Sequence, residues 1–245
     1  MNPTSSRRLR YIATGLYGCV GACVPAAQAA DALGGSVNIT SDYVYRGITQ
    51  TQGEPALQAD LHYQTRRGWA IGAWVSTADV DRHESAALEV DLYLSRDWML
   101  NHDWNARVSL THYAYPNDAR LLDYDYDELA GTLSYRSRLF TTVAWSPNTS
   151  RYSNGKVVWD QRAISYEITA SQPLNSQWSA SAGLGYYDLP TILQADYWYW
   201  NVGLACTLGR AQLAVSYIDT SRSATDAFGY PLAGSRWVGS LAWRF

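Results

Sequence analysis

Charged residues recur along this chain within segments in which apolar and polar residues alternate. Carboxylates and guanidiniums in such positions bind ions or pair with one another, depending on which face of the fold carries them. What they do together is therefore decided by the elements that hold them. The candidate site residues are Asp42, Arg46, Asp60, Glu89, Asp91, Arg107, Glu128, Glu167, Arg236 and Arg244.

The nucleophilic residues form no complete catalytic pattern. His83 and Ser85 are two positions apart, as a serine site acting on lipids would need, but they fall in a predicted loop and no third member follows. The sequence contains no G-x-S-x-G, no H-E-x-x-H and no P-loop. We expect no catalytic residues, no cofactor and no enzyme, with a lipid-modifying enzyme as the alternative.

An acidic stretch, Asp123-Tyr-Asp-Tyr-Asp-Glu128, raises the question of a calcium site. An EF-hand loop needs glycine at its sixth position and glutamate at its twelfth, where this chain has Glu128 and Ser134. We expect a solvated strand end and no metal site, while weak divalent binding stays open as an alternative.

The elements that hold these residues read as strands, because residues two apart share one face of a strand and the period-2 pattern recurs throughout. The final segment, Trp237-Val-Gly-Ser-Leu-Ala-Trp-Arg-Phe245, shows the pattern best. About twelve strands are predicted in this way. They lie near 35–46, 55–64, 69–77, 86–98, 104–115, 124–135, 139–146, 158–172, 178–187, 196–208, 211–219 and 235–245.

One face of these strands is apolar, as Leu57, Leu61 and Tyr63 show, while Asp60 and other charged residues share the opposite face. A slip of one residue would place Arg107 in lipid at a cost of about 2–4 kcal/mol near the membrane midplane. The pattern is typical of an all-β, transmembrane antiparallel β-barrel with a polar lumen. A soluble β-sandwich with an aromatic core is the alternative.

The connections alternate between short turns, such as 65–68 and 209–210, and longer polar loops, such as 147–157 and 220–234. Short periplasmic turns and long outer loops are characteristic of outer-membrane barrels, and an even number of strands returns both termini to the periplasm. We therefore expect both ends of the barrel chain to be periplasmic.

Tryptophan and tyrosine gather near strand ends, where amphipathic rings would meet lipid headgroups. They predict two aromatic girdles, a periplasmic one and an outer one. The periplasmic girdle comprises Tyr63, Trp69, Trp98, Trp104, Tyr135, Trp178, Trp243 and Phe245, and the outer one Tyr45, Trp145, Tyr186, Trp198, Tyr217 and Trp237.

The N-terminus predicts export. Arg7, Arg8 and Arg10 precede an apolar stretch over 11–24, and an A-x-A cleavage site ends at Ala29. We expect a signal peptide over 1–29 and a barrel over 30–245; acylation at Cys23 is the alternative. Cleavage leaves one cysteine and makes the net charge more negative than the −3 of the whole chain, which argues against nucleic-acid binding.

Ser41-Asp-Tyr-Val-Tyr-Arg-Gly-Ile-Thr-Gln-Thr51 resembles the opening signature of the Gcw_chp family, also called TorF-type porins. Further matching segments follow in order at 53–56, 68–76, 88–93, 113–116 and 125–129, so the resemblance covers a little under half of the chain. It implies an exported proteobacterial outer-membrane β-barrel of the porin kind and carries no substrate with it.

Asp42 and Arg46 lie inside that signature, four residues apart on one face of the predicted first strand. A strand rise near 3.3 Å separates them by about 13 Å, so each needs a partner elsewhere. Arg46 would either anchor the first loop against the wall or form part of an outer constriction. The charged set as a whole would either select ions in an open bore or fill the bore as a salt-bridged plug.

The expected function is passage of small hydrophilic or ionic solutes through a narrow polar lumen in the outer membrane, with a preference for cations. A non-conducting structural or adhesive barrel is the main alternative. Expected partners are outer-membrane lipid, lipopolysaccharide and the barrel-assembly machinery. The machinery would recognise the C-terminal strand through Trp243 and Phe245, although Ser240 stands where the usual assembly signal has glycine.

Overall fold

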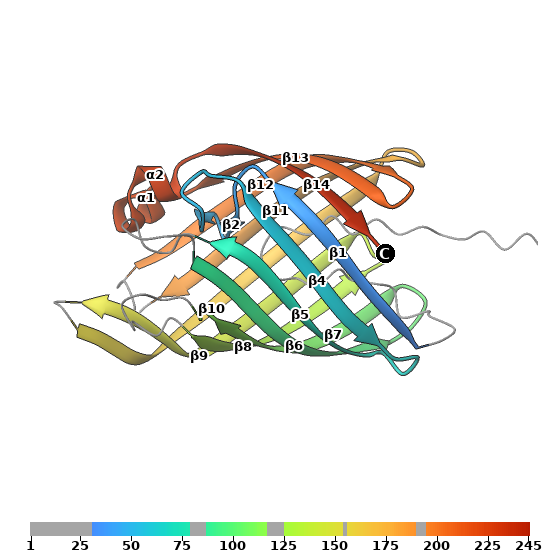
Figure 1. Cartoon of the computed structure of the whole chain (residues 1–245), viewed down its shortest axis with the longest axis horizontal. Coiled ribbons are helices and arrows are strands. Elements are labelled where there is room, and N and C mark those ends of the chain that lie inside the picture. The colour runs from blue at the N-terminus through green and yellow to red at the C-terminus, as the bar shows by residue number, and fades with distance from the viewer. Residues whose placement is uncertain (1–30, 79–86, 117–124, 154–155, 190–194) are drawn as a thin grey trace, which may run out of the picture.

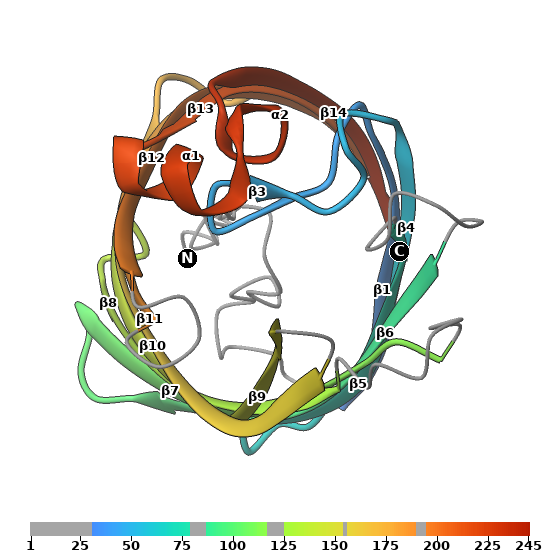
Figure 2. The same ribbon diagram turned by 90° about the vertical axis from the view of Figure 1, so that its left-hand side faces the viewer.

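The computed structural model describes residues 31–78, 87–116, 125–153, 156–189 and 195–245. Within these residues, twelve strands form a closed antiparallel barrel, and β1 pairs with both β4 and β14 to complete the wall (Figures 1 and 2). The wall strands are β1 (Ala32–Thr40), β4 (Ala56–Gln64), β5 (Trp69–Ala78), β6 (Ala87–Met99), β7 (Trp104–Ala114), β8 (Tyr126–Tyr135), β9 (Leu139–Ser153), β10 (Lys156–Pro173), β11 (Trp178–Leu189), β12 (Ala195–Leu208), β13 (Ala211–Thr220) and β14 (Arg236–Arg244).

The predicted barrel is confirmed, and the bounds of most strands agree with the prediction to within a few residues. The first strand is the exception, because the strand predicted over 35–46 ends at Thr40. The loop predicted over 147–157 is also wrong in extent, since β9 runs to Ser153 and β10 begins at Lys156. The predicted signal peptide over 1–29 lies outside the described residues.

Two insertions lie at the end of the barrel opposite the short turns (Figure 1). The first is a small hairpin, β2 (Val44–Tyr45) and β3 (Ile48–Thr49), in the connection between β1 and β4. The second contains the helices α1 (Arg222–Phe228) and α2 (Tyr230–Ala233) between β13 and β14, where a loop was predicted. In the view along the barrel, both insertions lie within the ring of wall strands (Figure 2). No helix among the described residues has the length and apolar character to cross a membrane.

The outer surface of the wall is apolar, as the alternation predicted. Leu61 of β4, Leu92 of β6 and Leu110 of β7 each expose about half of their surface, at 51%, 55% and 52%. Their neighbours along each strand point into the barrel, and Asp91 is fully buried there. Apolar side chains exposed on every side of a closed wall are unfavourable in water and suit a hydrocarbon environment.

Candidate functional site in the lumen

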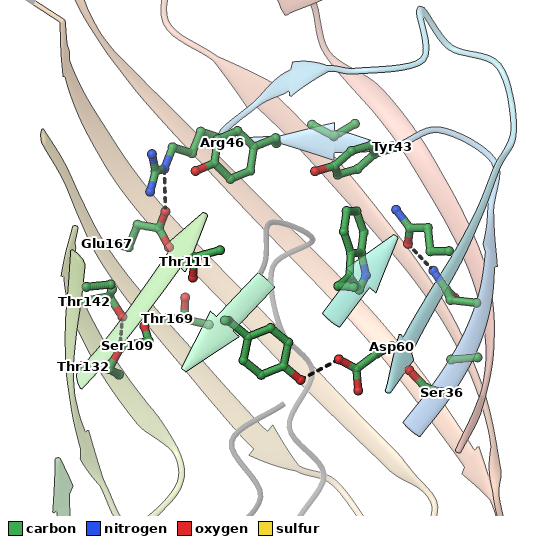
Figure 3. A pocket seen from close by; sticks show the side chains of 18 of the residues that line it. Ser36, Tyr43, Arg46, Asp60, Ser109, Thr111, Thr132, Thr142, Glu167 and Thr169 are labelled. Carbon is green, nitrogen blue, oxygen red and sulfur yellow. Dashed lines mark hydrogen bonds and ion pairs between the residues drawn. The ribbon is translucent and has the colours of Figure 1, made fainter. Parts of the chain in front are cut away.

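The wall encloses a cavity of about 280 Å³ whose lining includes residues from every wall strand and from the β2–β3 hairpin. Small hydroxyl side chains line one side of it, from β7 to β10 (Figure 3). Because these side chains are short, they leave the bore unfilled on that side. The hydroxyl-bearing residues labelled there are Ser109, Thr111, Thr132, Thr142 and Thr169.

The predicted site residues fall into three groups according to where the structure places them. Asp42 and Arg236 lie beside a second hollow at the mouth that carries the helices. Glu89 and Asp91 of β6 point inward and are covered by neighbouring side chains, with 2% and 0% of their surface exposed. The remaining six line the main cavity. These are Arg46, Asp60, Arg107, Glu128, Glu167 and Arg244.

Asp42 and Arg46 do not lie on a wall strand as predicted, because the chain leaves the wall after Thr40 and folds inward. The Thr40 hydroxyl donates to the backbone carbonyl of Asp42 at 2.8 Å, which directs the chain into the lumen. Tyr45 then pairs with Ile48 across the two-residue turn Arg46-Gly47. Both turn residues have positive φ, 48° and 83°, which is the type I′ geometry that suits a tight hairpin.

The Asp42 carboxylate ties the base of the hairpin together. Its Oδ1 accepts hydrogen bonds from the hydroxyls of Thr49 and Thr51, which come from the returning arm. Its Oδ2 accepts from Nη1 of Arg236, at the start of β14, at 2.8 Å. The whole segment is therefore attached to the wall by a largely buried ion pair as well as by its own backbone.

Apolar contacts hold the body of the hairpin in place. Val44 packs with Ile218 of β13 and Val238 of β14. Ile48 is 8% exposed and belongs to a cluster that includes Tyr197 and Tyr199 of β12 and residues of α1 and α2. Each such burial contributes roughly 1.5–3 kcal/mol. The hairpin is thus a packed part of the fold.

Arg46 stands at the tip of the hairpin and reaches the opposite side of the bore (Figure 3). Its Nη2 donates to Oε2 of Glu128 on β8 at 2.8 Å, and its Nε lies 3.6 Å from Oε1 of Glu167 on β10. The guanidinium carbon lies 4.7 Å from the ring centre of Tyr45 and 4.6 Å from that of Tyr187. Arg46 therefore joins the hairpin to the far wall and lies within the cavity lining, a position compatible with either interpretation offered by the sequence.

A second polar group lies deeper in the cavity. Oδ1 of Asp60 is 2.6 Å from Nδ1 of His62, and the Tyr93 hydroxyl donates to Oδ2 of Asp60 at 2.7 Å (Figure 3 shows this hydrogen bond). Arg107 makes two hydrogen bonds, of 2.9 and 2.8 Å, to Asp97. Many of the lumen charges are thus paired, as the plug interpretation requires, while the cavity around them stays open.

Most of the predicted girdle residues on the wall strands lie near strand ends, whereas Trp145 lies near the middle of β9, which runs further than predicted. Trp69, Trp104 and Trp178 are the first residues of their strands and expose 46%, 38% and 44% of their surface. At the other end, Trp237 exposes 69% and its ring centre lies 5.2 Å from that of Tyr217. The other predicted members lie on wall strands, or in Phe245 just past β14. These are Tyr63, Trp98, Tyr135, Trp145, Tyr186, Trp198, Trp243 and Phe245.

Tyr45 departs furthest from the predicted girdles. It belongs to β2 and lines the lumen cavity, because its segment folds inward where a wall strand was predicted. A tyrosine in this position contacts Arg46 in place of lipid.

Two sequence proposals fall mainly outside the described residues. His83 and Ser85 lie in 79–86, and Asp123 lies in 117–124. Of the other acids in that stretch, Asp127 bonds to His112 and to Asn148 on neighbouring strands. Among the residues that the structure describes, no group of three or more His, Cys, Asp or Glu side chains is arranged to hold a metal ion.

The sequence interpretation missed Tyr43, Tyr187 and Asp97. Asp97 was within reach, because the alternation of β6 places it inward and strand pairing sets it opposite Arg107. Tyr43 stacks edge-on against Trp74 at 5.4 Å and donates to Glu89. The local sequence pattern does not predict these contacts of Tyr43, because they depend on the inward path of the hairpin.

The comparisons with known proteins agree on the fold. The KdgM porin aligns with 87% of this chain and 98% of its own, at 10% identity and a TM-score of 0.52. The NanC porin aligns with 86% and 98%, at 11% and 0.54. LpxR from Salmonella typhimurium aligns with 86% and 99%, at 9% and 0.50. At these identities the likeness shows the barrel fold alone.

No curated protein matches the sequence. A family model does, over residues 26–243, and its description is a bacterial protein of unknown function, Gcw_chp. The narrower TorF-type name stays a prediction from the first-strand signature. Because the match spans nearly the whole chain and includes every wall strand and the inward hairpin, this protein belongs to the Gcw_chp family.

Proposed function

We propose that this protein is an outer-membrane channel through which small hydrophilic or ionic solutes pass passively, and that it is not an enzyme. The observation that supports this most is the polar cavity, which residues of every wall strand line, inside a wall whose outer surface is apolar. Twelve-stranded barrels lie between the filled eight-stranded kind and the open sixteen-stranded kind, so a narrow bore is expected.

The balance of charge in the lumen supports a preference for cations. Among the described residues, the inward set holds more carboxylates than guanidiniums, and a lumen with an excess of one charge attracts the opposite ion. The carboxylates are Asp42, Asp60, Glu89, Asp91, Asp97, Glu128 and Glu167, and the guanidiniums Arg46, Arg107, Arg236 and Arg244.

The excess of carboxylates in the lumen also indicates which class of solute would be preferred. One of the similar barrels is the KdgM porin in complex with oligogalacturonate, a chain of acidic sugars. A polyanion would meet unfavourable potential beside Asp60 and Glu167, whose side chains retain 17% and 14% exposure to the cavity. We therefore propose that neutral and cationic solutes are preferred.

The remaining parts of the proposal follow from a position in the outer membrane. The signal peptide over 1–29 is removed, both barrel termini are periplasmic, and the aromatic girdles contact outer-membrane lipid and lipopolysaccharide. The C-terminal strand, with Trp243 and Phe245, is offered to the barrel-assembly machinery. Six of the ten charged site residues line the main cavity and lie along the proposed solute path, and these are Arg46, Asp60, Arg107, Glu128, Glu167 and Arg244.

Reconstitution of the barrel in a planar bilayer tests the function. We expect discrete conductance steps, and under a salt gradient a reversal potential of the sign that indicates cation preference. The double variant Asp60→Asn, Glu167→Gln should lower that preference. Asp103→Asn is the matched control, because Asp103 lies in the turn between β6 and β7, outside the lumen. A barrel that stays silent under all salts and voltages would contradict the proposal.

One observation favours a second candidate, a non-conducting structural or adhesive barrel: the hairpin and helices occupy part of one mouth (Figure 2). In that case, shortening the ends of β9 and β10 within 147–157 and the connection within 220–234 should abolish a surface-binding phenotype and leave permeability unchanged. Conductance that appears only when the hairpin is removed would also support this second candidate.

A further inference from the structure

The surroundings of Arg46 have the composition of a binding site for an organic cation. Two carboxylates, Glu128 and Glu167, face its guanidinium at 2.8 and 3.6 Å, and the rings of Tyr45 and Tyr187 lie within 5 Å of its central carbon. Aromatic rings combined with carboxylates recognise guanidinium and alkylammonium groups through cation–π attraction and charge-assisted hydrogen bonds.

We call these four residues, Tyr45, Glu128, Glu167 and Tyr187, the cage. Most of the cage is built from wall strands, which hold it in place without Arg46. Glu128 on β8 accepts a hydrogen bond from the hydroxyl of Ser146 on β9 at 3.2 Å. Glu167 on β10 accepts one from the hydroxyl of Tyr199 on β12 at 2.5 Å. Tyr187 on β11 packs against the apolar cluster around Ile48. Neighbouring strands therefore hold both carboxylates in place, which lowers the entropy that a ligand must overcome on binding.

Arg46 occupies the cage, but its guanidinium does not use all of its N–H groups in hydrogen bonds there. Nη2 donates to Glu128 at 2.8 Å, whereas Nε lies 3.6 Å from Glu167, beyond hydrogen-bond distance, and both Nε and Nη1 are buried without a well-formed hydrogen bond. The position of the guanidinium is set by the hairpin, whose type I′ turn and apolar contacts fix the backbone. A free cation of the same kind would be able to turn and use its remaining N–H groups.

We propose that Glu128, Glu167 and Tyr187 form a lumen site for guanidinium and alkylammonium groups, and that Arg46 is its tethered occupant. Arg46 then determines specificity, because it prevents organic cations from binding to the wall and leaves the bore beside it for smaller ions. This inference rests on the proposed channel function for its meaning, but the site itself can be tested without conductance.

The test uses the full barrel purified in detergent, with methylguanidinium as the probe and sodium chloride at equal ionic strength as the reference. Arg46→Asn empties the cage and should preserve the turn, because Asn-Gly is the preferred type I′ pair. Arg46→Gly is the second variant, since glycine also accepts positive φ. Arg136→Asn is the matched control. Arg136 also has positive φ, 51°, an ion pair of 2.9 Å and a ring contact, but it lies in an exposed turn.

Calorimetry should show saturable binding to both Arg46 variants with a dissociation constant of about 1–100 mM, as one charge-assisted hydrogen bond and one cation–π contact imply. The wild type, Arg46→Lys and Arg136→Asn should show none. Adding Glu128→Gln to Arg46→Asn should weaken binding at least about tenfold.

Two results would overturn the inference: absence of binding in both folded Arg46 variants, or equal binding in Arg136→Asn. Conductance then separates the two proposals. If the variants conduct, methylguanidinium should reduce the current with the midpoint found by calorimetry. Binding in a silent barrel would support the site and contradict the channel, whereas a conducting barrel that binds no probe would do the reverse.

Discussion

Gly47 provides a direct test of whether the hairpin is packed into the lumen as described. A Cβ atom at this position would lie 2.5 Å from Cγ2 of Thr220 and 2.8 Å from Cβ of Tyr199, and the backbone φ is +83°. Gly47→Ala therefore meets two separate obstacles, a left-handed backbone and a steric clash with the wall. Gly53, in the same connection, has φ +88° and nothing within 4 Å of its Cβ position.

Comparing the two variants separates the free-energy cost of the left-handed backbone from the cost of the steric clash. A left-handed conformation costs a non-glycine residue about 1–2 kcal/mol, which is all that Gly53→Ala should show. Overpacking against Thr220 and Tyr199 adds about 1–3 kcal/mol to Gly47→Ala. At about 1.4 kcal/mol per factor of ten, the equilibrium for local opening of the hairpin should rise roughly 5- to 30-fold in Gly53→Ala and roughly 30- to 4000-fold in Gly47→Ala.

Hydrogen exchange measured by mass spectrometry reads this opening directly, because exchange of a protected amide follows the free energy of local opening. The informative amides are in the hairpin, among them that of Gln50, which donates to the carbonyl of Tyr43 at 2.6 Å. Peptides from the wall strands are the internal reference and should not change. If both variants lose equal protection, or if Gly47→Ala loses none, the hairpin does not pack against β12 and β13 as described.

Two further perturbations address the wall and the short turns. Val108→Arg, on the lipid face, should cost about 2–4 kcal/mol in the free energy of folding into vesicles, whereas Ser109→Arg, on the adjacent lumen face, should fold nearly normally, and equal costs would contradict the assigned faces. The Arg136 guanidinium lowers the pKa of Asp103 below its ordinary 3.8, so wild type should exceed Asp103→Asn in urea midpoint at neutral pH. That difference should vanish as pH falls through the lowered pKa and should be small, because the pair is exposed, and a difference that grows with acid would contradict the assignment.

The wall could be predicted from the sequence because each of its strands faces two different environments. Apolar residues such as Leu92 and Leu110 must meet the outside, and polar residues such as Asp91 must meet the lumen, so burial follows a period of two. The same alternation identified Arg107 and Glu167 as inward residues. Topology then followed from the alternation of short and long connections.

The hairpin could not be predicted in that way, because inside the lumen both of its faces are enclosed. Val44 and Ile48 are buried there together with Asp42 and Thr49, so the period-2 pattern loses its meaning. The sequence of the turn also gave no sign of a type I′ turn. Arginine at the first position of a type I′ turn is uncommon, since asparagine, aspartate and glycine are preferred, and the segment read as a continuation of the first strand.

The family signature takes on a different meaning once its residues are placed. Asp42 ties the hairpin to the wall, Gly47 makes the turn, and Arg46 carries the charge to the opposite side of the bore. None of these roles serves the wall, whose strands need only alternation and are formed by many different side chains. The most specific motif of the chain therefore forms the inward hairpin, and on the proposed channel function the selectivity of the lumen is the property in which members of this family should be compared.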